Sequence, residues 1–93
     1  MRERDIESYL RERAKAAGGI AYKFTSPGNA GVPDRLVLLP AGRVAFVELK
    51  APGKQPTPLQ LRQQKRIRNL GFQVLVIDSK AGVDEFIKGV KHS

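Results

Sequence analysis

Two acidic side chains interrupt the most apolar segments of the chain. Asp34 opens the segment 34–39, and Glu48 lies near the end of the segment 43–50. An ionised carboxylate costs several kcal/mol to bury without a partner, so acidic residues in buried strands need a specific role. Pro40, Ala41 and Gly42 between the segments suit a three-residue hairpin loop. In such a hairpin Asp34 lies opposite Glu48, with Cβ atoms about 4.5–5.5 Å apart on one face of the sheet.

Lys50 adds an ammonium group to the two carboxylates. It follows Glu48 by two residues, so its side chain projects from the same face of the strand. Two carboxylates at this spacing repel each other unless a cation lies between them, and hard oxygen ligands suit Mg²⁺ or Mn²⁺. The lysine can position an attacking water and stabilise negative charge at a phosphorus centre. The alternative interpretation is a structural salt-bridge cluster at a strand end, and the spacing alone leaves both open.

The charge balance of the chain points to a polyanionic partner. Seventeen Lys and Arg stand against nine Asp and Glu in 93 residues, a formal net charge of +8. Nucleic acid is the commonest partner of such a domain, although charge does not separate a binding module from an enzyme. Cysteine is absent, which excludes disulfides and cysteine-ligated zinc. The length allows one domain, 1–93, with a thin core.

The elements that must position these residues follow from apolar spacing and from helix caps. Apolar residues at helical spacing give the first helix one buried stripe: Ile6, Tyr9, Leu10, Ala14 and Ala17. Thr57 is an N-cap with Pro58 at the first helical position. The apolar residues that follow mark a helix of mixed amphipathicity: Leu59, Leu61, Ile67 and Leu70. The predicted elements, in chain order, are helix 2–17, strands 20–25, 34–39 and 43–50, helix 58–70, strand 72–77, and a last helix that Ser79 caps, with apolar residues Val83, Phe86, Ile87 and Val90.

This αβββαβα order predicts an α/β fold with a mixed sheet flanked by helices. The helix between the third and fourth strands is long enough for a crossover that returns the chain parallel to the third strand. Both hairpin segments are apolar on both faces, so we expect these strands to be central and covered on two sides.

Four motifs resemble those of the VRR-NUC domains of the PD-(D/E)XK nuclease superfamily. Pro33-Asp34 corresponds to the "PD" of the superfamily, and Glu48-Leu49-Lys50 to its "(D/E)XK". The resemblance covers nearly the whole chain and is to small stand-alone proteins of phages and bacteria. The motifs are Gly31-Val32-Pro33-Asp34-Arg35, Val47-Glu48-Leu49-Lys50, Pro52-Gly53 and Pro58-Leu59-Gln60.

The resemblance implies a restriction-endonuclease-like core that hydrolyses DNA phosphodiesters with Mg²⁺ or Mn²⁺. It further implies a preference for branched DNA such as four-way junctions, and a homodimer as the working unit. Asp34 and Glu48 would be metal ligands, joined by the backbone carbonyl of Leu49, and Lys50 would be the catalytic lysine. Gln60 matches the downstream glutamine of the family, in the first turn of its helix, where the positive helix end favours phosphate.

The glutamate that the family carries on its first helix is matched by Glu7. This residue precedes Leu10 by three positions and flanks the apolar stripe, so by the resemblance it would lean toward the metals as a further ligand and catalytic residue. Glu3 lies one turn earlier on the same side of the helix and is the rival, whereas Glu12 points elsewhere. Without the resemblance, all three are interpreted as solvated helix charges.

The helix 58–70 carries four cations, Arg62, Lys65, Arg66 and Arg68, which would line a DNA groove or form a solvated face. A non-catalytic DNA-binding module on the same fold is the main alternative to an enzyme. Asp34 and Glu48 argue against the binding module, because a protein that only binds DNA gains nothing from acidic groups that face phosphates. No segment reaches the roughly 18 apolar residues of a membrane span, and the N-terminal residues resemble no signal peptide. We therefore expect a soluble protein of the cytoplasm of a bacterial or phage-infected cell.

Overall fold

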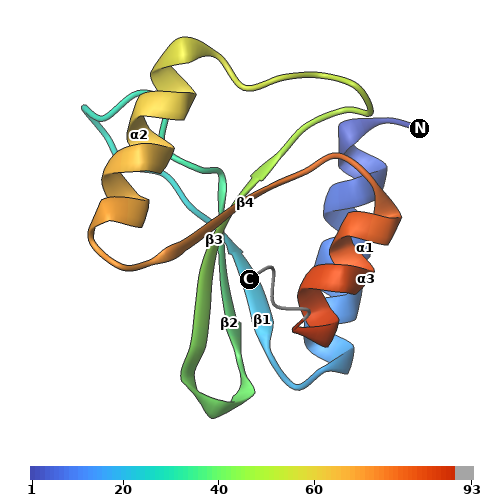
Figure 1. Cartoon of the computed structure of the whole chain (residues 1–93). Helices are drawn as coiled ribbons and strands as arrows, with labels where there is room; N and C mark the ends of the chain where they lie inside the picture. The colour runs from blue at the N-terminus through green and yellow to red at the C-terminus, as the bar shows by residue number, and fades with distance from the viewer. Residues whose placement is uncertain (90–93) are drawn as a thin grey trace.

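The computed structural model describes residues 1–89, and their helices and strands follow the predicted order (Figure 1). A single 3₁₀ turn, Pro40–Gly42, joins the second and third strands. The predicted contribution of Val90 to the last helix lies outside the described residues. The elements are α1 (Glu3–Ala16), β1 (Ile20–Lys23), β2 (Arg35–Leu39), β3 (Arg43–Leu49), α2 (Pro58–Asn69), β4 (Gln73–Ile77) and α3 (Lys80–Lys88).

The four strands form one mixed sheet in the order β1-β2-β3-β4. Strand β2 is antiparallel to both β1 and β3, whereas β4 runs parallel to β3 after the crossover through α2. The predicted mixed sheet and crossover are therefore confirmed.

The β2–β3 hairpin has the predicted register. Leu39 pairs with Arg43 and Arg35 pairs with Val47, as a three-residue loop requires. Ala41 and Gly42 adopt left-handed φ angles of 65° and 74° in the turn. Glycine takes such an angle without steric cost, so Gly42 suits this connection.

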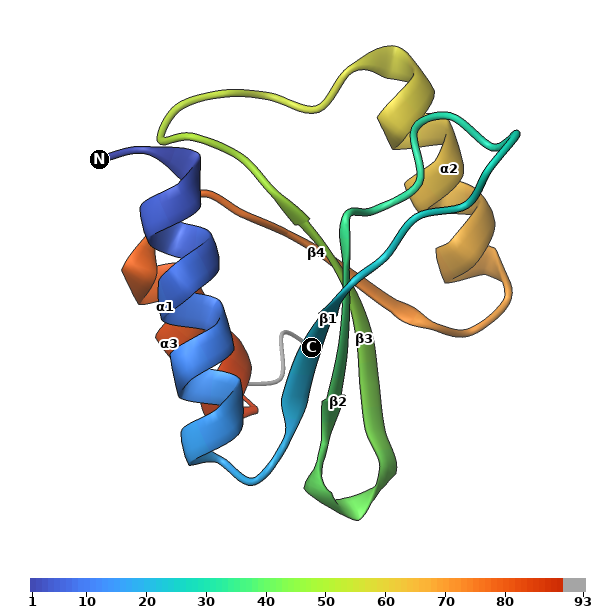
Figure 2. The ribbon, with the colours of Figure 1, turned by 180° about the vertical axis from the view of Figure 1, so that it is seen from behind.

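Helices α1 and α3 pack side by side over one face of the sheet (Figures 1 and 2). Alternate residues of β2 and β3 point into this layer and complete the main core, because side chains alternate between the two faces of a strand. The buried residues are Ile6, Leu10 and Ala14 of α1, Val83 and Phe86 of α3, and Val37, Leu39, Ala45, Val47, Leu49 and Ile77 of the sheet. Within residues 1–89, no helix has both the length and the apolar character to cross a membrane.

The opposite face of the sheet is covered only in part, by α2. Gln64 and Val74 are buried there. Phe46 packs edge-to-face between Phe24 and Phe72, at centroid distances of 5.5 and 6.1 Å. A helix of 12 residues is about 18 Å long and about 10 Å wide, too narrow to cover four strands spaced about 4.8 Å apart.

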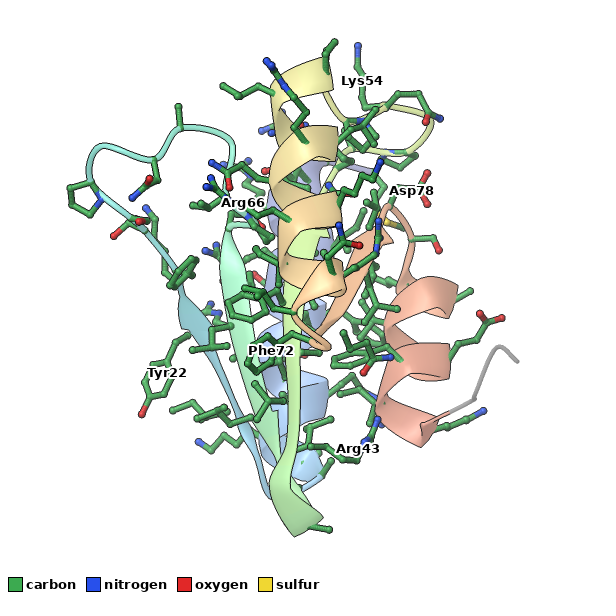
Figure 3. All side chains as sticks on the ribbon, turned by 60° about the vertical axis from the view of Figure 1, so that its left-hand side comes forward. Tyr22, Arg43, Lys54, Arg66, Phe72 and Asp78 are labelled. Carbon is green, nitrogen blue, oxygen red and sulfur yellow. The ribbon has the colours of Figure 1, made fainter. Side chains whose placement is uncertain are left out.

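A row of apolar side chains next to the hairpin turn remains uncovered on the α2 face. The pairing register places Ile20, Leu38 and Val44 side by side on three neighbouring strands. Figure 3 labels Tyr22 at the edge of the sheet and Phe72 just beyond the end of α2. The prediction that both faces of the central strands are covered is therefore wrong for this half of the sheet. We call these residues the uncovered patch: Ile20, Tyr22, Leu38, Val44 and Phe72, which are 37–51% exposed.

Candidate active site

The hairpin register brings Asp34 and Glu48 to the same end of the sheet. Asp34 immediately precedes β2, one step beyond the Arg35–Val47 pair, and Glu48 is the next residue along β3. The Oδ1 atom of Asp34 accepts a hydrogen bond from the backbone N–H of Leu49 at 3.1 Å. The carboxylate of Asp34 is thus held against the backbone that carries Glu48.

Glu48 is a buried carboxylate with one oxygen left unpaired. The residue is 4% exposed, and its Oε1 has no hydrogen-bond partner among the described residues. Its Oε2 accepts a hydrogen bond from Gln60 Nε2 at 3.4 Å and lies 3.8 Å from Lys50 Nζ. A buried acceptor without a partner is costly, so Oε1 is a position where a cation would be favourable.

The pKa of Glu48 is raised to about 7, mainly by burial and also by the negative charge of Asp34. The ammonium of Lys50 opposes this shift, while the charge of Glu3 adds to it. Burial also raises the pKa of Asp34, against the lowering effects of the Leu49 N–H and of Arg35. Both carboxylates are therefore more basic than usual, and a bound divalent cation would lower both pKa values.

Lys50 is anchored at the end of β3. Its backbone N–H donates to the Ile77 carbonyl at 3.0 Å, which extends the β3–β4 pairing by one residue. Its side chain is only 15% exposed and lies beside Glu48, as the two-residue spacing predicted.

Gln60 reaches the site from the first turn of α2. Thr57 Oγ1 accepts from the backbone N–H of Gln60 at 3.2 Å, and Gln60 Oε1 accepts from the backbone N–H of Thr57 at 2.9 Å. This capping box, together with Pro58 at the first helical position, fixes the start of the helix. The amide nitrogen of Gln60 is then directed toward Glu48. The site therefore includes an α2 side chain whose amide oxygen is bonded to Thr57 and whose amide nitrogen is bonded to Glu48.

Glu7 does not contact Asp34 or Glu48. Its Oε1 pairs with Arg11 Nε at 2.9 Å and with Arg35 Nη2 at 3.4 Å. Glu3, the rival on the same helix, is exposed, but its charge contributes to the raised pKa of Glu48. Glu12 is exposed and belongs neither to the Glu7–Arg35 pair nor to the group around Glu48. Within residues 1–89, no third Asp, Glu, His or Cys joins the two carboxylates to form a set of three.

Arg35 was not identified as a site residue from the sequence. Its Nη1 donates to the backbone carbonyl of Asp34 at 3.0 Å, while its Nη2 pairs with Glu7. Arg35 therefore connects α1 to the residue that carries the first carboxylate. The sequence did show an arginine at the start of an otherwise apolar strand. It did not show that the partner of this arginine lies on a distant helix.

Known proteins with similar sequences and structures point to one family. No family model matches the chain. A protein of Acyrthosiphon pisum secondary endosymbiont phage 1, described as "Putative nuclease p44", is 58% identical over 80 residues, which is 86% of each chain. A solved structure described as a VRR_NUC domain aligns with a TM-score of 0.87 and 39% identity, covering 96% of this chain and 97% of that one. The predicted resemblance is thereby confirmed, and the chain belongs to the VRR-NUC family of nuclease domains.

Proposed function

We propose that this protein is a divalent-metal-dependent DNA endonuclease that uses Mg²⁺ or Mn²⁺ at the Asp34–Glu48 site. The observation that carries this proposal is the unpaired Oε1 of Glu48, buried beside a second carboxylate. A cation at this position would satisfy the unpaired oxygen and relieve the repulsion between the two carboxylates.

The donor atoms at the site suit a hard cation. Asp34 and Glu48 offer carboxylate oxygens, and the backbone carbonyl of Leu49 is the third proposed ligand. When bound, the cation supplies Lewis-acid activation of water and neutralises charge on the phosphate. The proposed contribution of Glu7 is less direct: it holds Arg35 against the backbone of Asp34, and thereby positions a ligand.

Lys50 and Gln60 would act on the substrate side of the site. The ammonium of Lys50, next to Glu48, can hold the attacking water and stabilise charge that develops on the phosphorus centre. The amide of Gln60 lies at the positive end of α2, where it can donate a hydrogen bond to a phosphate oxygen. Both groups also fix the carboxylate of Glu48 in one orientation.

The alternative function is a basic, non-catalytic DNA-binding module on the same fold. Its affinity would come from phosphate contacts by Lys and Arg. The buried carboxylate of Glu48 and the half-buried carboxylate of Asp34 would only repel phosphates in such a module, so they favour the enzyme.

We further propose that the enzyme is a homodimer. The uncovered patch is a row of apolar side chains that α2 leaves exposed, and a second copy of the chain would bury it. Closed two-fold pairs are by far the commonest way to cover such a surface. The domain itself is small and buries few residues between α2 and the sheet, which also favours association.

The proposed substrate is branched DNA such as a four-way junction. Two active sites related by a two-fold axis match the approximate two-fold symmetry of a junction, so two strands can be cut in one encounter. The excess of positive charge would hold the arms through contacts with their phosphates.

Cleavage assays with defined DNA structures test this function. Linear, flap and four-way DNA are incubated with the protein in Mg²⁺, in Mn²⁺ and in EDTA. We expect cleavage only with metal, and more of it on the four-way DNA. DNA binding without cleavage under all three conditions would support the non-catalytic module instead. Cleavage with equal rates on linear and branched DNA would refute only the structural preference.

A further inference from the structure

Helix α2 carries a second group of charged and polar side chains outside the candidate active site. A shallow groove of about 520 Å³ runs along one side of this helix. Figure 3 shows Arg66 on the side of α2 that faces the loop between β1 and β2. The groove is lined by Leu59, Arg62, Gln63, Lys65, Arg66 and Asn69.

The position of the groove is fixed by contacts between α2 and the β1–β2 loop. Gln63 Nε2 donates to the Ala30 carbonyl at 3.2 Å. A Cβ atom added at Gly31 would lie 2.9 Å from Leu59 Cγ, so the glycine allows the loop to approach the helix closely. The groove is therefore part of a packed arrangement of helix and loop.

The cations of the groove are available for an anionic ligand. Arg62, Lys65 and Arg66 are exposed, and within residues 1–89 none of them forms a salt bridge. The sequence of α2 contains no acidic residue that would neutralise them. Arg68 differs: its Nη2 donates to the Val74 carbonyl at 3.0 Å, so this arginine fixes α2 to β4. Of the four cations singled out from the sequence, Arg62, Lys65 and Arg66 line the groove, whereas Arg68 is exposed outside it.

We propose that this groove binds the sugar–phosphate backbone of the DNA strand next to the bond that is cut. This inference rests on the proposed nuclease function and extends it to a second contact site. The lining cations and the amides of Gln63 and Asn69 are donors for phosphate oxygens. The groove has no aromatic residue on which a base could stack, so the expected contacts are with phosphates, and phosphate contacts carry no sequence information.

The groove begins at the first turn of α2, which also carries the Gln60 side chain of the candidate active site. Leu59 lines the groove and adjoins Gln60, whose amide contacts Glu48. From Gln60 to Arg66 the helix rises by about 9 Å, at 1.5 Å per residue. Successive phosphates of one strand lie farther apart than the roughly 3.4 Å that each step advances along the duplex axis, so the groove accommodates one or two phosphates beyond the site.

Binding measurements in the absence of metal test this proposal apart from catalysis. The variant is Arg62→Ala with Arg66→Ala, and the matched control is Lys15→Ala with Lys88→Ala, which removes two exposed helix charges on the opposite side of the sheet. Fluorescence anisotropy with a short duplex in EDTA gives the affinity over a range of salt concentrations.

Loss of two phosphate contacts should lower the slope of log K against log salt by up to about 1.8, and the affinity at 0.1 M salt by roughly ten- to sixty-fold. The control pair should change the affinity by less than about three-fold, because its charges lie away from the bound strand. Replacing both arginines by lysine keeps the charges and should restore most of the slope.

Equal losses of affinity in the groove variant and the control would overturn the proposal, since they would reflect net charge alone. If the wild-type protein cleaves DNA while the groove variant binds like the control, the groove assignment fails and the nuclease proposal stands. Weakened binding by the groove variant, together with no cleavage by the wild type in any metal, would support the groove and refute the nuclease.

Discussion

Gln60 Nε2 donates a hydrogen bond to Glu48 Oε2 at 3.4 Å, and this bond joins the first turn of α2 to the end of β3. The same glutamine closes the capping box with Thr57. Gln60 therefore both stabilises the first turn of the helix and orients a buried carboxylate. A displacement of the helix start would change the position of the Glu48 carboxylate, because the orientation of a carboxylate with few hydrogen-bond partners depends strongly on each of them.

We expect each of three substitutions at the candidate site to reduce cleavage by orders of magnitude: Asp34→Asn, Glu48→Gln and Lys50→Ala. The first two remove negative charge that a divalent cation needs, and the third removes the ammonium next to it. Affinity for DNA in EDTA should stay within a few-fold of wild type, as measured by anisotropy. Near-normal cleavage by any one variant would exclude that residue from the site.

Glu48 should make the metal-free protein less stable as the pH rises. Its pKa is about 7 in the folded chain against 4.5 for the free side chain, so the folded state binds this proton more tightly. Stability is therefore lost as the pH rises from about 4.5 to about 7, and the loss persists above that range. The expected size is on the order of 2–4 kcal/mol, at about 1.4 kcal/mol per pKa unit.

The Glu48→Gln variant tests this pH effect. In EDTA at pH 8 its free energy of unfolding, from urea titration, should exceed that of wild type, and the difference should shrink toward pH 4.5. Excess Mg²⁺ should stabilise wild type more than the variant, by about 2–3 kcal/mol at a hundred times Kd. Glu12→Gln, at an exposed position of α1, is the control and should follow wild type. A wild type that is as stable as the variant at pH 8 in EDTA would contradict the assignment.

The two functions of Gln60 can be separated by comparing it with its capping partner. Thr57→Ala removes the side-chain cap and should cost about 1 kcal/mol of stability with little effect on the cleavage rate. Gln60→Ala removes part of the cap and also the contact with Glu48, so we expect a similar loss of stability and at least a ten-fold lower rate. Urea unfolding and single-turnover cleavage give the two quantities. Equal rates in the two variants would reduce Gln60 to a capping residue.

The hairpin part of the site could be predicted from the sequence because its geometry is local. The length of the Pro40–Gly42 connection determines the register, and the register brings Asp34 to Glu48. The position of Lys50 follows from the two-residue period of a strand. Thr57 and Ser79 were likewise recognised as caps, since a cap depends only on residues within the next turn.

Contacts between distant elements could not be predicted in this way. The pairing of Arg35 with Glu7 depends on how α1 packs on the sheet, which apolar spacing does not define in detail. In α2, the buried residue is Gln64, whereas Leu59, Leu61 and Leu70 are 41–73% exposed. The leucines indicated a helix correctly, but the side of the helix that faces the sheet is set by the crossover and by the β1–β2 loop.

The two candidate glutamates of α1 should differ in their effects. Glu7→Gln leaves Arg35, whose side chain is 15% exposed, without its carboxylate partner, and should cost about 1–3 kcal/mol of stability. We also expect at least a ten-fold slower cleavage, because Arg35 holds the backbone of Asp34. Glu3→Gln should leave stability unchanged below about pH 4.5 and lower the pKa of Glu48, seen as a shift of the metal-free stability profile to lower pH. A slower rate in Glu3→Gln and a normal rate in Glu7→Gln would reverse the two roles.

The proposed dimer should depend on the uncovered patch. Leu38→Lys with Val44→Lys places two charges in the centre of the apolar row and should give a monomer by light scattering, at concentrations where wild type is a dimer. Both positions already face solvent in the single chain, so we expect the fold to be retained, and circular dichroism checks this. Leu61→Lys is the control, because Leu61 is 51% exposed on α2 and lies outside the patch.

On a plasmid with a cruciform, wild type should cut two strands within one encounter, whereas the monomeric variant should release a nicked intermediate before the second cut. A monomeric wild type, or a dimer unaffected by the double substitution, would refute this interface and leave the metal site untouched.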